Sequence, residues 1–150
     1  MKRVVLAAAL SCAALGAQAY CVQNDLANRS IVVEQEKHPD SLRDERRFRH
    51  TLAPGEKQCC RFHDLDCNPG GRENSVVNLA ITIPGEPAYA CGFPEGSEPN
   101  VKVTGGGTLR VVRNPRRKSA IPYVVRVRTH DRKDLTGPRG LACPEIPKGK

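Results

Sequence analysis

Aromatic residues are scarce in this sequence. It has no Trp and only three Phe and three Tyr among 150 residues. Proteins that hold single-stranded nucleic acid stack its bases on exposed aromatic side chains. The three Phe are expected to point inward, so neither a nucleic-acid stacking platform nor a sugar-stacking, lectin-like site is predicted. Sequence-specific nucleic-acid binding is likewise not expected.

Long apolar runs and common catalytic motifs are also missing. Beyond the N-terminal residues, no apolar run approaches the roughly 20 residues of a spanning helix. Neither a Gly-x-Ser-x-Gly elbow nor a His-Glu-x-x-His motif occurs. No pair of acidic residues is set apart by its surroundings, as glycoside hydrolysis would require. We therefore expect a non-catalytic protein without a transmembrane segment after signal cleavage.

The first nineteen residues have the pattern of a secretory signal peptide. Lys2 and Arg3 form a positive start, residues 4–15 are apolar, and Ala17 and Ala19 are the small residues that a signal peptidase reads. The apolar stretch is too short for a membrane anchor. We predict cleavage after Ala19 and a periplasmic or secreted protein, with these two locations left open.

Cleavage would change the cysteine count from odd to even. Cys12 leaves with residues 1–19, and the charge falls from +8 to +6 because Lys2 and Arg3 leave too. About a third of the remaining 131 residues are hydrophobic, which makes a thin core. Each disulfide typically adds about 2–4 kcal/mol in such exported domains. We predict three disulfides, in an unassigned pairing, among Cys21, Cys59, Cys60, Cys67, Cys91 and Cys143.

The adjacent Cys59 and Cys60 fall within one predicted strand, so their side chains point to opposite faces. We expect two different bridges, because a bond between adjacent residues is strained. Cys60, on the face of Phe62, is predicted to bridge inside the protein, and Cys59 to hold a loop or terminus over the outer face. A zinc or copper site is less favoured, since no second Cys pair has the spacing of a structural zinc site.

Apolar residues recur at every second position of several short segments. Residues 75–83 place Val77, Leu79, Ile81 and Ile83 on one face. The same alternation occurs over residues 29–35, 46–52, 56–63, 107–113 and 121–129, and turn residues separate these segments. Many short strands at this spacing are typical of an all-β sandwich or barrel.

We predict an all-β fold, a disulfide-stapled antiparallel β-sandwich of about eight or nine short strands. A single domain is expected over residues 20–147, with a loop-rich C-terminal segment from about residue 130. The oligomeric state is not predicted. The length is that of one domain, and the sequence shows neither an internal repeat nor a second domain.

Basic residues fall mostly on outward positions of the predicted strands. They are Arg47, Arg49, Lys57, Arg61, Arg110, Arg126 and Arg128, while Arg113, Arg116, Arg117 and Lys118 crowd one strand end and its loop. A positive stripe attracts anions and speeds their encounter. We predict an anion-binding surface for an envelope polymer, a lipid headgroup or an acidic protein. The alternative is a solvated face with cross-strand pairs to Glu34, Glu36 and Glu45.

Two other chemistries are left open. Asp64, Asp66 and Asn68 offer oxygen atoms at alternate loop positions, as calcium sites do, although such residues are also common in turns. A calcium-stabilised envelope protein is therefore one alternative, and no other cofactor is expected. The second alternative is a small secreted hydrolase, a ribonuclease-like phosphodiesterase. It would use two of His50, His63 and His130 as acid and base.

The start of the predicted mature chain resembles thaumatin-like β-sandwich proteins. The resemblance lies in a first short strand ending at Asn24, a second strand with residues 31–33, and Leu52-Ala53-Pro54-Gly55 leading into the next strand. It covers about forty residues. The dense cysteine framework and acidic cleft of that family have no counterparts here, so the resemblance implies a sandwich and no function.

Overall fold

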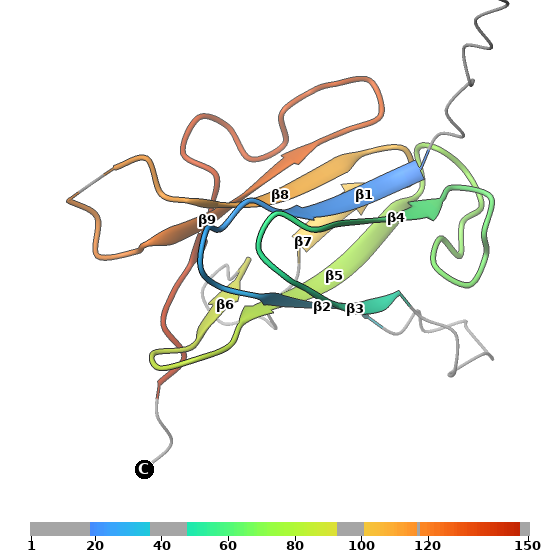
Figure 1. Ribbon diagram of the computed structural model, residues 1–150. Helices are drawn as coiled ribbons and strands as arrows, with labels where there is room; N and C mark the ends of the chain where they lie inside the picture. Colours follow the sequence, from blue (N-terminus) through green and yellow to red (C-terminus); the bar gives the residue numbers. More distant parts are fainter. Residues whose placement is uncertain (1–18, 37–47, 93–100, 117, 148–150) are drawn as a thin grey trace, which may run out of the picture.

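The computed structural model describes residues 19–36, 48–92, 101–116 and 118–147, which form ten strands and no helix (Figure 1). The strands are β1 (Ala19–Asn24), β2 (Ile31–Gln35), β3 (Arg49–Leu52), β4 (Lys57–Arg61), β5 (Val76–Ile83), β6 (Tyr89–Cys91), β7 (Val101–Thr104), β8 (Thr108–Arg113), β9 (Tyr123–Arg128) and β10 (Leu141–Cys143). The predicted all-β class is confirmed. Within the described ranges, no helix has the length and hydrophobicity needed to cross a membrane.

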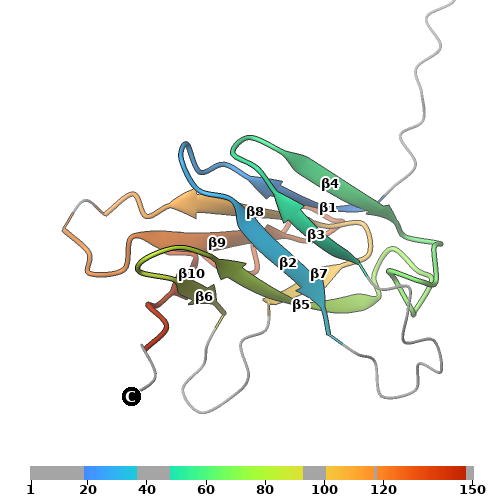
Figure 2. The ribbon, with the colours of Figure 1, turned by 60° about the horizontal axis from the view of Figure 1, so that its bottom comes forward.

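The strands form two five-stranded sheets that lie one over the other (Figure 2). Sheet A has the order β10-β9-β8-β1-β4, and sheet B has the order β3-β2-β5-β6 with β7 also paired to β5. The predicted sandwich is confirmed, with more strands than the eight or nine expected. The additional strands are short, since β6 and β10 have three residues each. One neighbouring pair, β1 with β8, is parallel.

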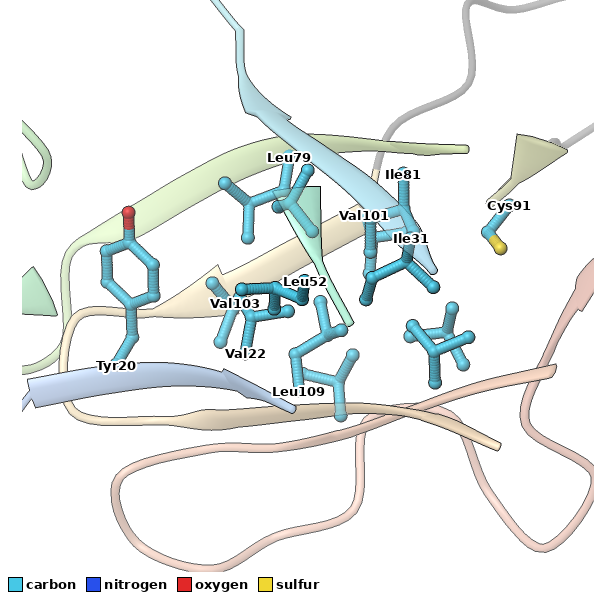
Figure 3. Close-up of a cluster of buried hydrophobic side chains, with 14 of the residues drawn as sticks. Tyr20, Val22, Ile31, Leu52, Leu79, Ile81, Cys91, Val101, Val103 and Leu109 are labelled. Atoms are coloured by element: carbon cyan, nitrogen blue, oxygen red, sulfur yellow. The ribbon is translucent and has the colours of Figure 1, made fainter. Parts of the chain in front are cut away.

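The core lies between the sheets and is built by the alternation seen in the sequence. Leu79, Ile81 and Ile83 of β5 are fully buried, and Val77 is 2% exposed. Residues of sheet A such as Val22 and Leu109 face them from the other side (Figure 3). Because successive side chains of a strand point to opposite faces, this burial fixes which residues of each strand point to solvent.

One side of the sandwich is closed where β6 of sheet B meets β10 of sheet A. The Ala90 amide donates to the Pro144 carbonyl and the Gly92 amide to the Ala142 carbonyl, each at 3.1 Å. Between these hydrogen bonds, the Cys91–Cys143 disulfide joins two fully buried residues. The two sheets are therefore linked both covalently and by backbone hydrogen bonds on this side.

The other two disulfides explain the adjacent cysteines. Buried Cys60 bonds to half-buried Cys67 and ties the following loop to β4. This agrees with the prediction that Cys60 forms a bridge inside the protein. Cys59 bonds on the outer face to Cys21, which lies directly opposite it on β1. Its partner therefore belongs to a neighbouring strand and not to a loop, and of the two predicted partners it agrees with the terminus, since Cys21 is two residues after the predicted cleavage at Ala19. Three disulfides indicate an oxidising, extracellular-type environment.

The buried Tyr20 makes the stability of the fold decrease at alkaline pH. It is fully buried, its ring packs on Phe48 with centroids 5.2 Å apart, and its hydroxyl donates to the Cys67 carbonyl at 3.2 Å. Burial, with a smaller contribution from Asp64, raises the pKa of Tyr20 far above the ordinary 10.0. Above about pH 10 the unfolded phenol loses its proton while the folded one keeps it, so the stability falls as the pH rises.

We expect Tyr20→Phe to remove this part of the alkaline slope, up to about 1.4 kcal/mol per pH unit. At neutral pH the variant should lose only the hydroxyl hydrogen bond, about 0.5–1.5 kcal/mol. Denaturant unfolding of both proteins from pH 8 to pH 11 measures the difference. Parallel stability curves over that range would contradict this role of Tyr20.

Candidate anion-binding site

Four basic side chains meet on the outer face of sheet A, where the strand register aligns them. Arg126 of β9 lies opposite Arg110 of β8, Arg110 lies opposite Gln23 of β1, and Gln23 lies opposite Lys57 of β4. Arg128 lies two residues after Arg126 on β9, on the same face and opposite Thr108. These residues line a hollow of about 310 Å³ together with Cys21 and Leu109. We call this site the basic hollow.

The core holds these side chains outward. Leu109 and Val111 on either side of Arg110 are fully buried, as are Val125 and Val127 on either side of Arg126. Rotating either strand to hide an arginine would expose these apolar residues, at about 1.5–3 kcal/mol for each side chain. The outward direction of the arginines is therefore a consequence of the packing between the sheets.

The basic hollow brings like charges together. Arg110 and Arg126 form a directly opposite cross-strand pair, an arrangement that is unfavourable for two charges of the same sign. Asp25 relieves part of this repulsion, because its carboxylate lies 2.6 Å from Arg110 Nε and is only 19% exposed. Arg126 donates from Nη2 to the Pro138 carbonyl at 3.4 Å. An anion in the hollow would relieve the remaining repulsion.

Asp134 is a second acidic neighbour of the hollow. Hydrogen bonds from Thr136, with smaller contributions from Gly137 and the charge of Arg126, hold the pKa of Asp134 below its ordinary value. Its carboxylate is therefore charged at neutral pH. In the part of the chain that the structure describes, Lys57 and Arg128 have no ion-pair partner. These two cations are the ones most available to a ligand.

The other predicted anion-binding residues lie elsewhere. Arg49 is on β3 of sheet B, on the opposite side of the sandwich, and its Nε lies 2.7 Å from Glu34, as the solvated-face alternative expects. Arg61 is at the end of β4, opposite Ala19. A separate hollow of about 630 Å³ at the β8–β9 connection is lined by Arg113 and Arg116.

Three predicted positions remain, and the structure describes one of them. Lys118 is exposed in the same β8–β9 connection. Arg47 and Arg117 lie outside the described residues, as does Glu45. Gln23 and Thr108, which line the basic hollow, were not predicted. The pairing of β1 with β8 places Gln23 beside Arg110, and the pairing of β8 with β9 places Thr108 beside Arg128.

The loop after β4 contains the predicted calcium ligands. The exposed Asp64 accepts a hydrogen bond at Oδ1 from the Asp66 amide at 3.1 Å. Asn68 is fully buried, and its Oδ1 has no hydrogen-bond partner in the described part of the chain. Within those ranges, no group of three His, Cys, Asp or Glu side chains is placed to hold a metal. Calcium binding at Asp64, Asp66 and Asn68 stays a prediction.

Asn68 has a clear structural role in this loop. Its amide nitrogen donates to the carbonyls of Phe62 and Arg72, so one side chain holds two turns together. A Cβ atom at Gly105 would overlap both Asn68 Nδ2 and the Arg72 carbonyl, which explains the glycine there. The loop is thus ordered by an inward-pointing amide as well as by the Cys60–Cys67 bond.

We expect Asn68→Ala to lower the free energy of unfolding by about 2–4 kcal/mol, because two partly buried carbonyls lose their donor. The matched control is Asn74→Ala, at an exposed position of the same loop, which should change stability by less than about 0.5 kcal/mol. Urea unfolding of the three proteins measures both effects. Equal stability of the two variants would contradict the role assigned to Asn68.

The three predicted catalytic histidines come from different parts of the fold. His50 is half-buried on β3 and packs edge-on against Phe48, with ring centroids 4.6 Å apart. His63 and His130 are exposed in loops, where His63 contacts Phe62 and the His130 amide donates to Thr104 Oγ1 at 3.0 Å. Among the described residues, no contact joins two of these histidines. Paired-histidine catalysis stays a prediction.

No family model, no curated protein and no solved structure matches this chain. Its function is therefore inferred from the residues of its surface. The feature with the most definite chemistry is the basic hollow. It combines opposed arginines with Lys57 and Arg128, which have no ion-pair partner among the described residues, on neighbouring strands of one sheet.

Proposed function

We propose that the protein is an exported, non-catalytic binding protein that holds an anionic polymer in the basic hollow. The observation that carries this proposal is the cross-strand pair of Arg110 and Arg126, with Lys57 and Arg128 beside it. From β9 to β4 the cations extend over three strand spacings, about 14 Å. A chain with repeated negative charges can contact all of them, whereas a single compact headgroup cannot.

Export of the protein is part of the same proposal. The N-terminal pattern over residues 1–19 supports a signal peptide cleaved after Ala19, and the three disulfides support an oxidising compartment. Tyr20 would then be the first residue of the mature protein, and its full burial means that the domain uses the chain from that residue on.

Retention on immobilised heparin, a sulfated polysaccharide, tests the proposal directly. The protein starting at Tyr20 should bind the column at low salt and elute as the ionic strength rises, because salt screens exposed charges. The matched control is a column of the uncharged matrix. Passage through heparin without delay at low salt would reject an anionic-polymer function.

Asp25→Asn should strengthen this binding. Asp25 neutralises part of the charge of Arg110, and its removal frees that guanidinium for the polymer. We expect elution at a higher salt concentration and an affinity gain of about two- to fivefold, as befits one partly exposed ion pair. Glu34→Gln, which frees Arg49 on sheet B, is the control and should leave elution nearly unchanged. A larger gain in affinity from Glu34→Gln than from Asp25→Asn would contradict a site on sheet A.

A further inference from the structure

The Cys21–Cys59 disulfide differs from the other two by its position in the fold. It lies on the outer face of sheet A, Cys21 lines the basic hollow, and Cys59 is exposed on the edge strand β4. By contrast, Cys91 and Cys143 are fully buried, and Cys60 is 3% exposed. A dissolved thiol therefore reaches Cys59 more readily than any of these three sulfur atoms.

Positive charge surrounds this disulfide. Lys57 and Arg61 lie two residues before and after Cys59, so both share its outward face, and both are exposed. Across the sheet, the row that contains Cys59 and Cys21 continues through Thr108 to Arg128. Of the acidic residues near this face, Asp25 is engaged by Arg110. Asp134 lies opposite Arg128, and its carboxylate accepts a hydrogen bond from the Thr136 amide. Cationic surroundings attract anionic reagents and stabilise a cysteine thiolate.

We propose that Cys21–Cys59 is a redox-active bridge that exchanges with small anionic thiols, and that Cys59 is the sulfur atom they attack. The incoming thiolate forms a bond to Cys59 Sγ while the Cys21–Cys59 bond breaks and its electron pair leaves on Cys21 as a thiolate. A second thiol then attacks the mixed disulfide. Two thiols are oxidised to one external disulfide, and the protein gains two cysteine thiols.

Opening this bridge leaves the sheet intact. β1 is hydrogen-bonded to β4 over five register positions and to β8 over four, so the strands stay paired without the disulfide. The other two disulfides hold the loop after β4 and the closed side of the sandwich. The exchange is therefore a local modification at the basic hollow. It stands on the position and charge of the bridge and does not depend on polymer binding.

Three thiols with the same two-carbon skeleton test this proposal on the wild-type protein. They are 2-mercaptoethanesulfonate, 2-mercaptoethanol and cysteamine, whose thiolates differ in net charge. At low salt and equal thiolate concentration, the sulfonate should open Cys21–Cys59 about tenfold faster than cysteamine, with 2-mercaptoethanol between them. Alkylation and peptide mapping identify the opened bridge, and added salt should remove the difference.

A variant that lacks the two positive charges beside Cys59 gives the matched comparison. Lys57→Gln with Arg61→Gln should slow the sulfonate towards the rate of 2-mercaptoethanol and change the cysteamine rate least. Opening of Cys60–Cys67 or Cys91–Cys143 before Cys21–Cys59, or equal rates for all three thiols at low salt, would overturn the proposal. Heparin retention is measured separately, so its failure rejects the proposed function and leaves this result standing.

Discussion

Arg126→Glu combined with Arg128→Glu is expected to abolish retention of the protein on heparin at low salt. Both residues lie on β9, where Arg126 faces Arg110 and Arg128 has no ion-pair partner among the described residues. The double change replaces two attractive charges by two repulsive ones inside the basic hollow. Like charges at an interface cost several kcal/mol, which corresponds to an affinity loss of about 100-fold or more.

The control for this variant has the same change in net charge on the opposite face. Arg49→Glu with Lys102→Glu reverses two exposed basic residues of sheet B, on β3 and β7. Its elution should shift slightly, because only long-range charge changes and salt screens it within about 10 Å at 0.1 M. Equal loss of retention in the two variants would contradict a localised site.

Replacement of both Cys91 and Cys143 by Ala is expected to be the most destabilising change in the disulfide framework. The bond joins positions 52 residues apart and links sheet A to sheet B. Its loss should lower the free energy of unfolding by about 2–5 kcal/mol. Both residues are fully buried, so the missing sulfur atoms also leave a cavity in the core.

The corresponding double Ala variant of Cys21 and Cys59 separates these two contributions. That bridge spans 38 residues, so the entropy of the unfolded chain predicts a similar loss for both. It lies on the outer face between strands that are already paired, so little packing is lost there. Denaturant unfolding should therefore show the smaller loss for Cys21 and Cys59. The reverse order would contradict the structural role of the Cys91–Cys143 link.

The sequence predicted which way side chains point much better than it predicted which strands lie side by side. The alternation in β5 identified Val77, Leu79, Ile81 and Ile83 as core residues, and the structure confirms all four. The three-residue strands β6 and β10 are too short for alternation to reveal them. Their hydrogen bonds to each other come from the closure of the sandwich, which no local pattern encodes.

The same distinction explains which parts of the candidate site could be anticipated. Outward positions for Arg110, Arg126 and Arg128 followed from their buried neighbours. That Arg49 belongs to the other sheet did not follow, because assignment to a sheet depends on pairings between distant segments. The parallel contact of β1 with β8 is such a pairing, and it also places the Cys21–Cys59 bridge at the basic hollow.

The role of Asn68 could not be predicted from the sequence, for a third reason. Its spacing from Asp64 and Asp66 is equally typical of a cation loop and of a tight turn. The structure turns its amide inward to two backbone carbonyls, a role that depends on the close approach of Gly105. Neither the direction of the amide nor the neighbouring glycine, almost forty residues away in the chain, is visible in a local pattern.

An NMR titration with a sulfated oligosaccharide shows whether an anionic polymer binds at the basic hollow. The largest shifts are expected at the side-chain Nε–Hε signals of Arg110, Arg126 and Arg128, and at backbone amides of β8 and β9. Largest shifts at Arg113 and Arg116, or at Arg49 on sheet B, would contradict it, and so would a spectrum that does not change.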